Sequence, residues 1–262
     1  MKISCSLVVL LLSMVDLAAE VRTERLPEEA VTKLVSLNPE YLVYEKEGAG
    51  QKRLPLIIYL HGAGGVGENV RKIEKQPGLL LATVEKAGVA CLCVAPQASK
   101  SPLHLGKKGG WVPADLDLLI AHLKKTMSID PTRIYLTGNS MGGYGTIAWA
   151  AHSPGHFAAL APMVGGLGPG GPKDVTEELD VWGKNLKQIP LRAYYGRQDR
   201  VVPPDRGAML LKAIKQAGGT LAEVIVLEDE GHGAGRVPYG DEDFVKWLFS
   251  NKKGDRADSD SK

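Results

Sequence analysis

The sequence has few cysteines, with only Cys5, Cys91 and Cys93 among its 262 residues. None of them has the spacing of a zinc or haem motif, so the sequence predicts no metal centre of these kinds. Cys91 and Cys93 lie two residues apart in an apolar run, and on a strand their side chains would point in the same direction. That arrangement is unfavourable for a mutual disulfide, so we expect two buried thiols.

The sequence also lacks a large excess of charge of either sign, because it has 32 basic and 30 acidic residues and a net charge of +2. This balance gives no electrostatic case for a nucleic-acid partner or for a membrane surface. The sequence contains neither a phosphate-binding G-x-x-x-x-G-K-[ST] loop nor a G-x-G-x-x-G turn that opens a helix. We therefore expect no nucleotide site, and the function predicted below requires no metal or organic cofactor.

No apolar run is long enough to span a membrane. The longest one near the N-terminus, residues 7–12, follows Lys2 and precedes the small pair Ala18 and Ala19. This layout is typical of a secretory signal peptide over residues 1–19, and the alternative is a buried N-terminal helix. We expect a secreted or periplasmic protein without stable membrane insertion, and a disordered polar tail over residues 251–262.

Between these ends, residues 20–250 show no repeat and no linker, which indicates one catalytic domain. Apolar runs typical of strands alternate with segments of helical periodicity. The predicted strands are 40–44, 54–60, 89–94, 134–137, 157–164, 191–195 and 221–227, and the predicted helices are 76–88, 115–127, 144–150, 175–186, 204–218 and 241–249. We also expect a short helix within residues 20–35, a polar loop at 96–110 and a turn at 129–131.

This alternation predicts an α/β fold with a mostly parallel central sheet and helices on both faces. No large insertion separates the predicted strands 157–164 and 191–195, so we expect no large cap domain. In such sheets, functional residues gather beyond the carboxyl ends of the strands.

One such strand end carries the string Gly138-Asn139-Ser140-Met141-Gly142, with a β-rich run before it and a helical run after it. A sharp strand-to-helix turn leaves no room for side chains two residues on either side of its corner, and glycine occupies both places. The alternative is an ordinary glycine-rich loop. The flanking elements favour a turn that presents Ser140 as a nucleophile.

A serine nucleophile needs a base and a group that orients the base. His232 follows the last predicted strand between two glycines, and Asp199 follows the penultimate one. The chain order Ser140, Asp199, His232 is typical of α/β hydrolases. Other acidic residues also follow late strands, namely Asp174, Asp205 and Glu228 to Glu230.

After serine attack on a carbonyl, the transition state needs two backbone N–H donors that point at the negatively charged oxygen. The N–H of Met141 supplies one, and the loop after strand 54–60 supplies the other, from Ala63 or alternatively Gly64. We expect His61, in the same glycine-rich turn, to bond to nearby backbone.

The strings LPLIIYLHGAGG, DPTRIYLTGNSMGGYGT, YYGRQDRVVP and EGHG together resemble the α/β-hydrolase superfamily over nearly the whole chain after residue 19. The resemblance is to secreted esterases of the feruloyl-esterase, polyhydroxybutyrate-depolymerase and dienelactone-hydrolase-like type, some of which are described as peptidases or phospholipase/carboxylesterases. It implies a catalytic triad of Ser140, Asp199 and His232. The continuation Gly65-Val66-Gly67-Glu68 departs from the pattern of these families.

The resemblance implies a serine esterase that acts on small acyl or aryl esters or on esters carried by polysaccharides. Trp111 and Trp182 are candidate substrate-stacking residues, although each is equally suited to core packing. Two alternatives remain: a serine peptidase of the prolyl-oligopeptidase type, and a catalytically silent binding protein on the same fold.

Overall fold

The computed structural model describes residues 20–45, 53–100 and 110–254. The predicted signal peptide and the predicted tail from residue 255 onward lie outside the described residues.

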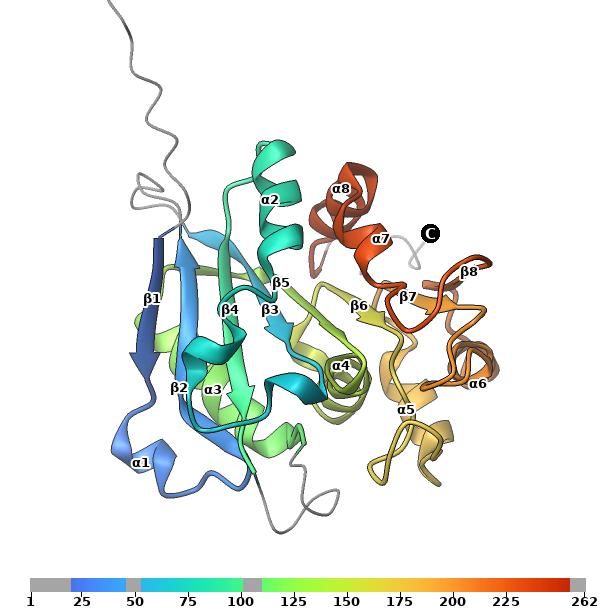
Figure 1. Ribbon diagram of the computed structural model, residues 1–262, viewed down its shortest axis with the longest axis horizontal. Coiled ribbons are helices and arrows are strands. Elements are labelled where there is room, and N and C mark those ends of the chain that lie inside the picture. Colours follow the sequence, from blue (N-terminus) through green and yellow to red (C-terminus); the bar gives the residue numbers. More distant parts are fainter. Residues whose placement is uncertain (1–19, 46–52, 101–109, 255–262) are drawn as a thin grey trace, which may run out of the picture.

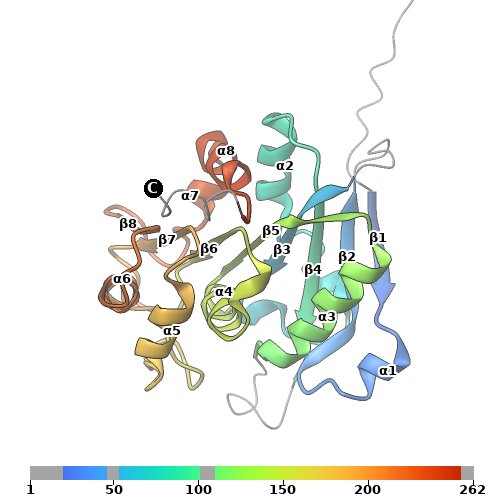
Figure 2. The ribbon, with the colours of Figure 1, turned by 180° about the vertical axis from the view of Figure 1, so that it is seen from behind.

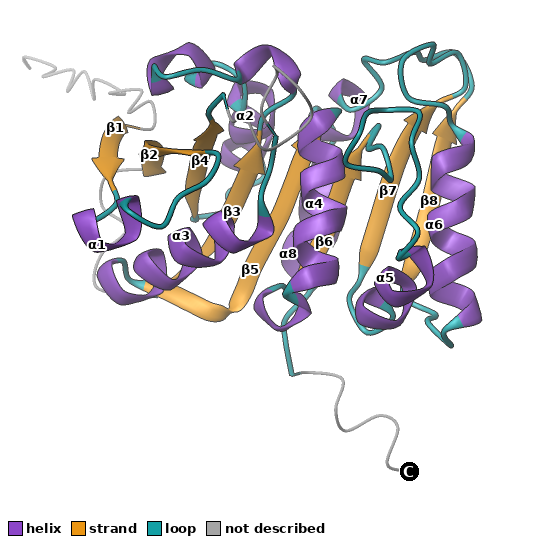
Figure 3. Ribbon diagram, turned by 90° about the horizontal axis from the view of Figure 1, so that it is seen from below, coloured by secondary structure: helices purple, strands orange, loops and turns teal. Residues whose placement is uncertain are grey.

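The described chain forms one eight-stranded sheet in the order β1-β2-β4-β3-β5-β6-β7-β8, which Figure 3 shows across its width. The strands are β1 (Glu20–Arg25), β2 (Leu37–Glu45), β3 (Leu54–Leu60), β4 (Leu92–Ala98), β5 (Ile129–Asn139), β6 (Ala159–Met163), β7 (Leu191–Gly196) and β8 (Ala222–Leu227). From β4 to β8 every pairing is parallel, while β1–β2 and β2–β4 are antiparallel. This topology confirms the predicted α/β fold with a mostly parallel sheet.

Helices cover both faces of this sheet, as Figure 1 and Figure 2 show from opposite sides. The helices are α1 (Glu28–Val31), α2 (Gly78–Lys86), α3 (Pro113–Thr126), α4 (Met141–His152), α5 (Leu179–Leu186), α6 (Asp205–Gln216), α7 (Arg236–Tyr239) and α8 (Glu242–Ser250), with 3₁₀ turns η1 (Ala63–Gly65), η2 (Val70–Ile73) and η4 (Pro154–His156). Between β6 and β7 the chain adds only α5 and its loops, so the absence of a large cap domain agrees with the sequence.

Strand β3 shows how the two cores form, because all seven of its residues are buried. Leu56 and Ile58 belong to the core under α3, α4, α5 and α6, whereas Ile57 and Tyr59 belong to the core under α2, α7 and α8. Alternate side chains of a strand point to opposite faces, so a continuous apolar run serves both layers.

The short helix expected within residues 20–35 is present as α1, whereas edge strand β1 before it was missed. The apolar alternation of β1 is weak, because charged residues such as Arg22 pair in solvent, with Glu45 at 2.6 Å. Two other local predictions were wrong. The predicted turn at 129–131 lies inside β5, where the Asp130 carboxylate accepts the backbone N–H of Thr132 and the strand register shifts. The predicted loop at 96–110 begins late, because β4 continues to Ala98.

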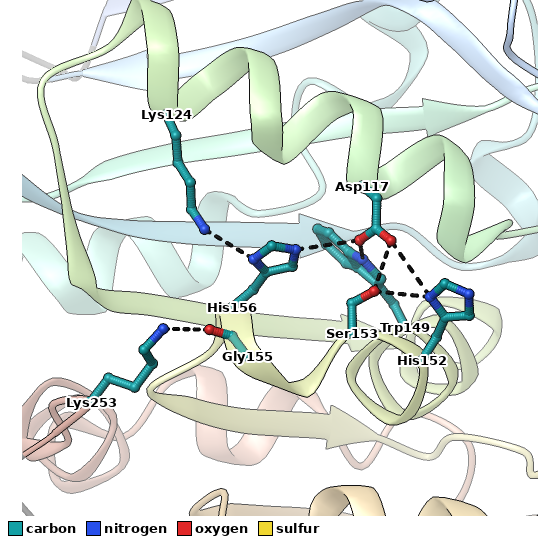
Figure 4. A network of polar contacts seen from close by, with 8 residues as sticks. All are labelled: Asp117, Lys124, Trp149, His152, Ser153, Gly155, His156 and Lys253. Atoms are coloured by element: carbon teal, nitrogen blue, oxygen red, sulfur yellow. Dashed lines mark hydrogen bonds and ion pairs between the residues drawn. The ribbon is translucent and has the colours of Figure 1, made fainter.

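Away from the strand ends, the Asp117 carboxylate on α3 ties α3 to the C-terminal end of α4, as Figure 4 shows. It accepts the indole N–H of buried Trp149 at 2.7 Å and the hydroxyl of Ser153 at 2.7 Å. His152 and His156 lie at the edge of this network, 3.5 Å from the carboxylate. These two histidines therefore take part in helix packing at a distance from the strand ends.

The folded domain continues past residue 250. Asn251 is buried, and the backbone N–H of Lys253 donates to the carbonyl of Thr132 at 2.9 Å. Among the residues that the structure describes, no helix is long and apolar enough to cross a membrane. The same residues contain no group of three or more His, Cys, Asp and Glu side chains suited to a metal ion.

Candidate active site

Ser140 stands at the corner between β5 and α4 with φ 59° and ψ −114°. A non-glycine residue in this region costs about 1–3 kcal/mol, and the surrounding structure must hold it there. The backbone N–H of Ser140 donates to the carbonyl of Met163 on the neighbouring strand at 2.9 Å. The backbone strain therefore lies at Ser140, the residue that the sequence predicts to be the nucleophile.

The two glycines around this corner are sterically required. A Cβ on Gly138 would lie 2.5 Å from the carbonyl oxygen of Leu60, and a Cβ on Gly142 would overlap the same oxygen. Strand β3 thus passes directly against the turn. The lack of room for a side chain at both positions confirms what the spacing of the two glycines predicted.

His232 lies in the loop after β8 and joins the two other predicted residues. Its Nε2 is 2.8 Å from the Ser140 hydroxyl, and its Nδ1 is 2.8 Å from Oδ2 of Asp199. A Cβ on Gly196, at the end of β7, would collide with the carbonyls of Glu230 and Gly231. Gly196 therefore lets the histidine loop approach, a role that the sequence analysis missed.

The Asp199 carboxyl group is fully buried, with no exposed side-chain surface. Its Oδ1 accepts the backbone N–H groups of Val201 at 2.7 Å and Val202 at 3.0 Å, which leaves Oδ2 for the histidine. These bonds fix the carboxylate in place and hold the ring of His232 with Nδ1 as the donor. The arrangement can activate a serine hydroxyl.

The rival acidic residues have other partners. Asp205 pairs with Arg206 at 2.8 Å, and Glu228 pairs with Arg197 at 2.9 Å. Asp174 lies against the glycine turn that includes Gly170. Within the described residues, Asp199 is the acid that contacts His232.

The loop after β3 runs beside the serine. A Cβ on Gly62 would lie 3.7 Å from Cβ of Ser140. The following turn η1 uses the N–H groups of Gly65 and Val66, which donate to Gly62 and Ala63. The N–H groups of Ala63 and Gly64 donate to no acceptor among the described residues, so both candidates for the second donor have a free hydrogen. Met141, the first residue of α4, has the free N–H of a helix start.

Buried polar side chains anchor the loop after β3 from the core. Nε2 of His61 accepts the N–H of Ala98 at 2.9 Å, and Nδ1 donates to the carbonyl of Gly62 at 2.7 Å. His61 is fully buried, and burial lowers its pKa from 6.5 to about 4. The ring is therefore neutral, and the expectation that it serves the backbone is confirmed.

Gln97 adds a second anchor that the sequence analysis missed. Its amide nitrogen donates to the carbonyls of Gly65 at 2.8 Å and Asn69 at 2.9 Å, and its oxygen accepts the amide of Asn38 at 2.8 Å. The side chain is fully buried. The sequence offered one signal for this role, because Gln97 is a polar residue at the end of an apolar run. We did not use that signal, because we predicted a loop over residues 96–110.

The two tryptophans are mostly buried. Trp111 is 4% exposed, and its indole N–H donates to the carbonyl of His61 at 3.2 Å, so it supports the loop from within the core. Trp182 is 8% exposed and lies with Tyr144 beside a cavity of about 370 Å³ between α4 and α5. Both positions agree with the packing alternative that the sequence left open.

The sheet and the geometry at its carboxyl edge define the class of the molecule, which is that of the α/β hydrolases. Among solved structures, a thermostable esterase is similar with a TM-score of 0.68 and 24% identity, over 90% of this chain and 64% of the other. A ferulic acid esterase is similar with a TM-score of 0.67 and 17% identity, over 89% and 98%. At these identities, the likeness concerns the fold.

The chain belongs to the esterase family whose model is described as "Putative esterase", which matches residues 37–214. A curated relative, "Putative esterase NocK" of Nocardia uniformis subsp. tsuyamanensis, is 31% identical over 159 residues. The match covers 58% of this chain and 42% of the relative, so the chain spans less than half of that protein's length.

Proposed function

We propose that the protein is a carboxylic ester hydrolase in which Ser140, His232 and Asp199 form the catalytic triad. The observation that carries the proposal is the continuous series of contacts at 2.8 Å from serine to histidine to buried aspartate. Family membership supports an ester as the substrate.

In the proposed reaction, the Ser140 hydroxyl attacks the ester carbonyl while Nε2 of His232 takes its proton. Asp199 keeps Nδ1 protonated and stabilises the imidazolium that forms. The negative charge on the carbonyl oxygen is received by the N–H of Met141 and by that of Ala63 or Gly64. The histidine then protonates the leaving alkoxide, and water hydrolyses the acyl-enzyme by the reverse sequence of proton transfers.

We propose small acyl or aryl esters, or esters carried by polysaccharides, as substrates, and export through residues 1–19. The sequence resemblance supports the substrates, and the n-region, apolar run and small residues before Glu20 support export. N-terminal sequencing of protein recovered from the exterior or periplasm tests export, and an N-terminus at Met1 contradicts it.

A fluorophosphonate probe tests the nucleophile. We expect covalent labelling at Ser140, mapped by peptide mass spectrometry, and labelling at another serine or at none overturns the assignment. A panel of 4-nitrophenyl acyl esters, methyl ferulate, acetylated xylan and peptide amides then tests the reaction. We expect turnover of esters, whereas a preference for amides would favour a peptidase.

A further inference from the structure

A cavity of about 500 Å³ opens next to the candidate triad, on the side of α2 and α7. Its lining includes Gly62, Asn139 and Gly233, which are neighbours in sequence of Ala63, Ser140 and His232. Helices α2 and α7 contact each other beyond it and lie side by side in Figure 1. The cavity therefore borders the point where the ester carbonyl must lie, and its volume suits one part of a small organic ligand.

The inner wall of this cavity is aromatic and neutral. Tyr59 and Tyr239 are each 5% exposed, with ring centroids 6.0 Å apart. The hydroxyl of Tyr239 shares a hydrogen bond of 2.8 Å with Thr137. Burial raises the pKa of Tyr59 to about 12 and that of Tyr239 well above its usual value. This wall therefore has no negative charge, and Leu79 extends its apolar surface.

Two cations line the same cavity from different elements. Lys75 precedes α2, and Arg236 is the first residue of α7. Neither side chain forms an ion pair or hydrogen bond with any part of the chain that the structure describes. Both residues are exposed, so their charged groups remain available to a ligand in the cavity.

Among the residues that the structure describes, no carboxylate lines the cavity. The acidic residues that adjoin these elements have other partners: Glu74 pairs with Arg71 at 3.0 Å, and Glu242 pairs with Lys86 at 2.6 Å. Asp241 accepts the N–H of Asp243 at 2.9 Å as the N-cap of α8. The positive charge facing the cavity is thus uncompensated within the described chain.

We infer that the ester substrate carries a carboxylate, which this cavity receives between Lys75 and Arg236. The inference rests on the proposed function, because it names the substrate class of the same site. The guanidinium group can bind a carboxylate with two parallel hydrogen bonds, and the ammonium group adds a second positive charge. The aromatic wall contacts the carbon chain that links the carboxylate to the ester.

The first experiment compares matched anionic and neutral esters. In one pair the carboxylate is on the acyl side (4-nitrophenyl hydrogen adipate against 4-nitrophenyl methyl adipate). In the other it is on the alcohol side (4-acetoxybenzoate against 4-acetoxybenzamide). At low salt we expect kcat/KM to favour the anionic member of one pair about tenfold, and to favour it less in 0.5 M salt. A ratio of one or below in both pairs overturns the inference.

A charge-removing variant locates the effect. We expect Arg236→Gln to lower the anionic-to-neutral ratio about fivefold. Lys215→Gln, at an exposed position of α6, should leave the wild-type ratio unchanged. Because the readout is a ratio, a general loss of active protein does not affect it. An unchanged ratio in Arg236→Gln contradicts the assignment of the anion to this cavity.

Binding to the Ser140→Ala variant separates this inference from the proposed function. Calorimetry should show ethyl hydrogen adipate or 4-acetoxybenzoate binding about tenfold more tightly than diethyl adipate or 4-acetoxybenzamide. Equal dissociation constants overturn the carboxylate inference even if the wild-type protein hydrolyses neutral esters. Conversely, if no ester is hydrolysed and Ser140 is not labelled, the proposed function fails while the binding result still decides the inference.

Discussion

Two parts of the candidate site lie at the same edge of the sheet but are supported in different ways. The triad side chains stand on loops after β5, β7 and β8, and the histidine side chain is 30% exposed. The loop after β3 is instead fixed from within the core by His61 and Gln97, which are fully buried. In the proposed mechanism, the first part supplies the reacting groups, whereas the second supplies backbone donors whose positions depend on the fold. We therefore expect changes in the first to affect rate alone and changes in the second to affect rate and stability together.

The largest effect is expected for Ser140→Ala, which removes the attacking oxygen. Turnover should fall about 10⁶-fold, by analogy with other serine triads, while the free energy of unfolding stays within about 0.5 kcal/mol. Steady-state kinetics and urea denaturation measure the two quantities. Ser250→Ala, at an exposed serine on α8, is the matched control and should change neither. A Ser140→Ala protein that retains most of its activity would refute the triad.

Asp199→Asn should lower turnover about 10⁴-fold, because an amide donor facing Nδ1 favours the wrong tautomer of His232. Its remaining oxygen can still accept the N–H groups of Val201 and Val202, so the loop should stay folded. Asp205→Asn on α6, where the aspartate pairs with Arg206, serves as the control. Similar losses in the two variants would show that Asp199 acts only in folding the loop.

The contrast between the two parts also decides what the sequence could predict. The three candidate triad residues could be predicted because sterics and chemistry leave a pattern in the chain: glycines around Ser140, and an acid and a histidine after late strands. The roles of Trp111 and Gln97 could not be read in the same way, because they depend on contacts with residues far away in sequence. The same holds for edge strand β1, whose pairing with β2 is a matter of tertiary structure rather than of local apolar alternation.

Gln97→Met keeps the size of the side chain but removes its three hydrogen bonds to Asn38, Gly65 and Asn69. Buried partners left without a bond should lower the free energy of unfolding by about 2–4 kcal/mol. Because the loop with Ala63 then loses one of its two anchors, kcat should fall about 10–100-fold with a smaller change in KM. Gln216→Met, at the exposed end of α6, is the control. A loss of stability without a loss of kcat would show that the loop does not need this anchor.

His61 makes the stability of the same part depend on pH. Its pKa in the folded protein, about 4, lies below the value of 6.5 expected for the unfolded chain, so the unfolded chain binds a proton first as pH falls. The stability is therefore complete above pH 6.5 and is lost progressively down to about pH 4, by up to about 3 kcal/mol. Urea unfolding across this range should show a steeper decline in the wild-type protein than in His61→Gln. Equal slopes would contradict a buried neutral histidine.

The smallest effect is expected far from the strand ends, at the Asp117 network of Figure 4. Asp117→Leu leaves the indole N–H of buried Trp149 and the hydroxyl of Ser153 without their acceptor, which should cost about 1–2 kcal/mol of unfolding free energy. Ester turnover should stay within about twofold, because neither group supports the loop after β3 or the triad. If this variant lost turnover as strongly as Gln97→Met, the coupling of rate to stability would be a general property of the fold. It would then not be specific to the backbone that we propose binds the oxyanion.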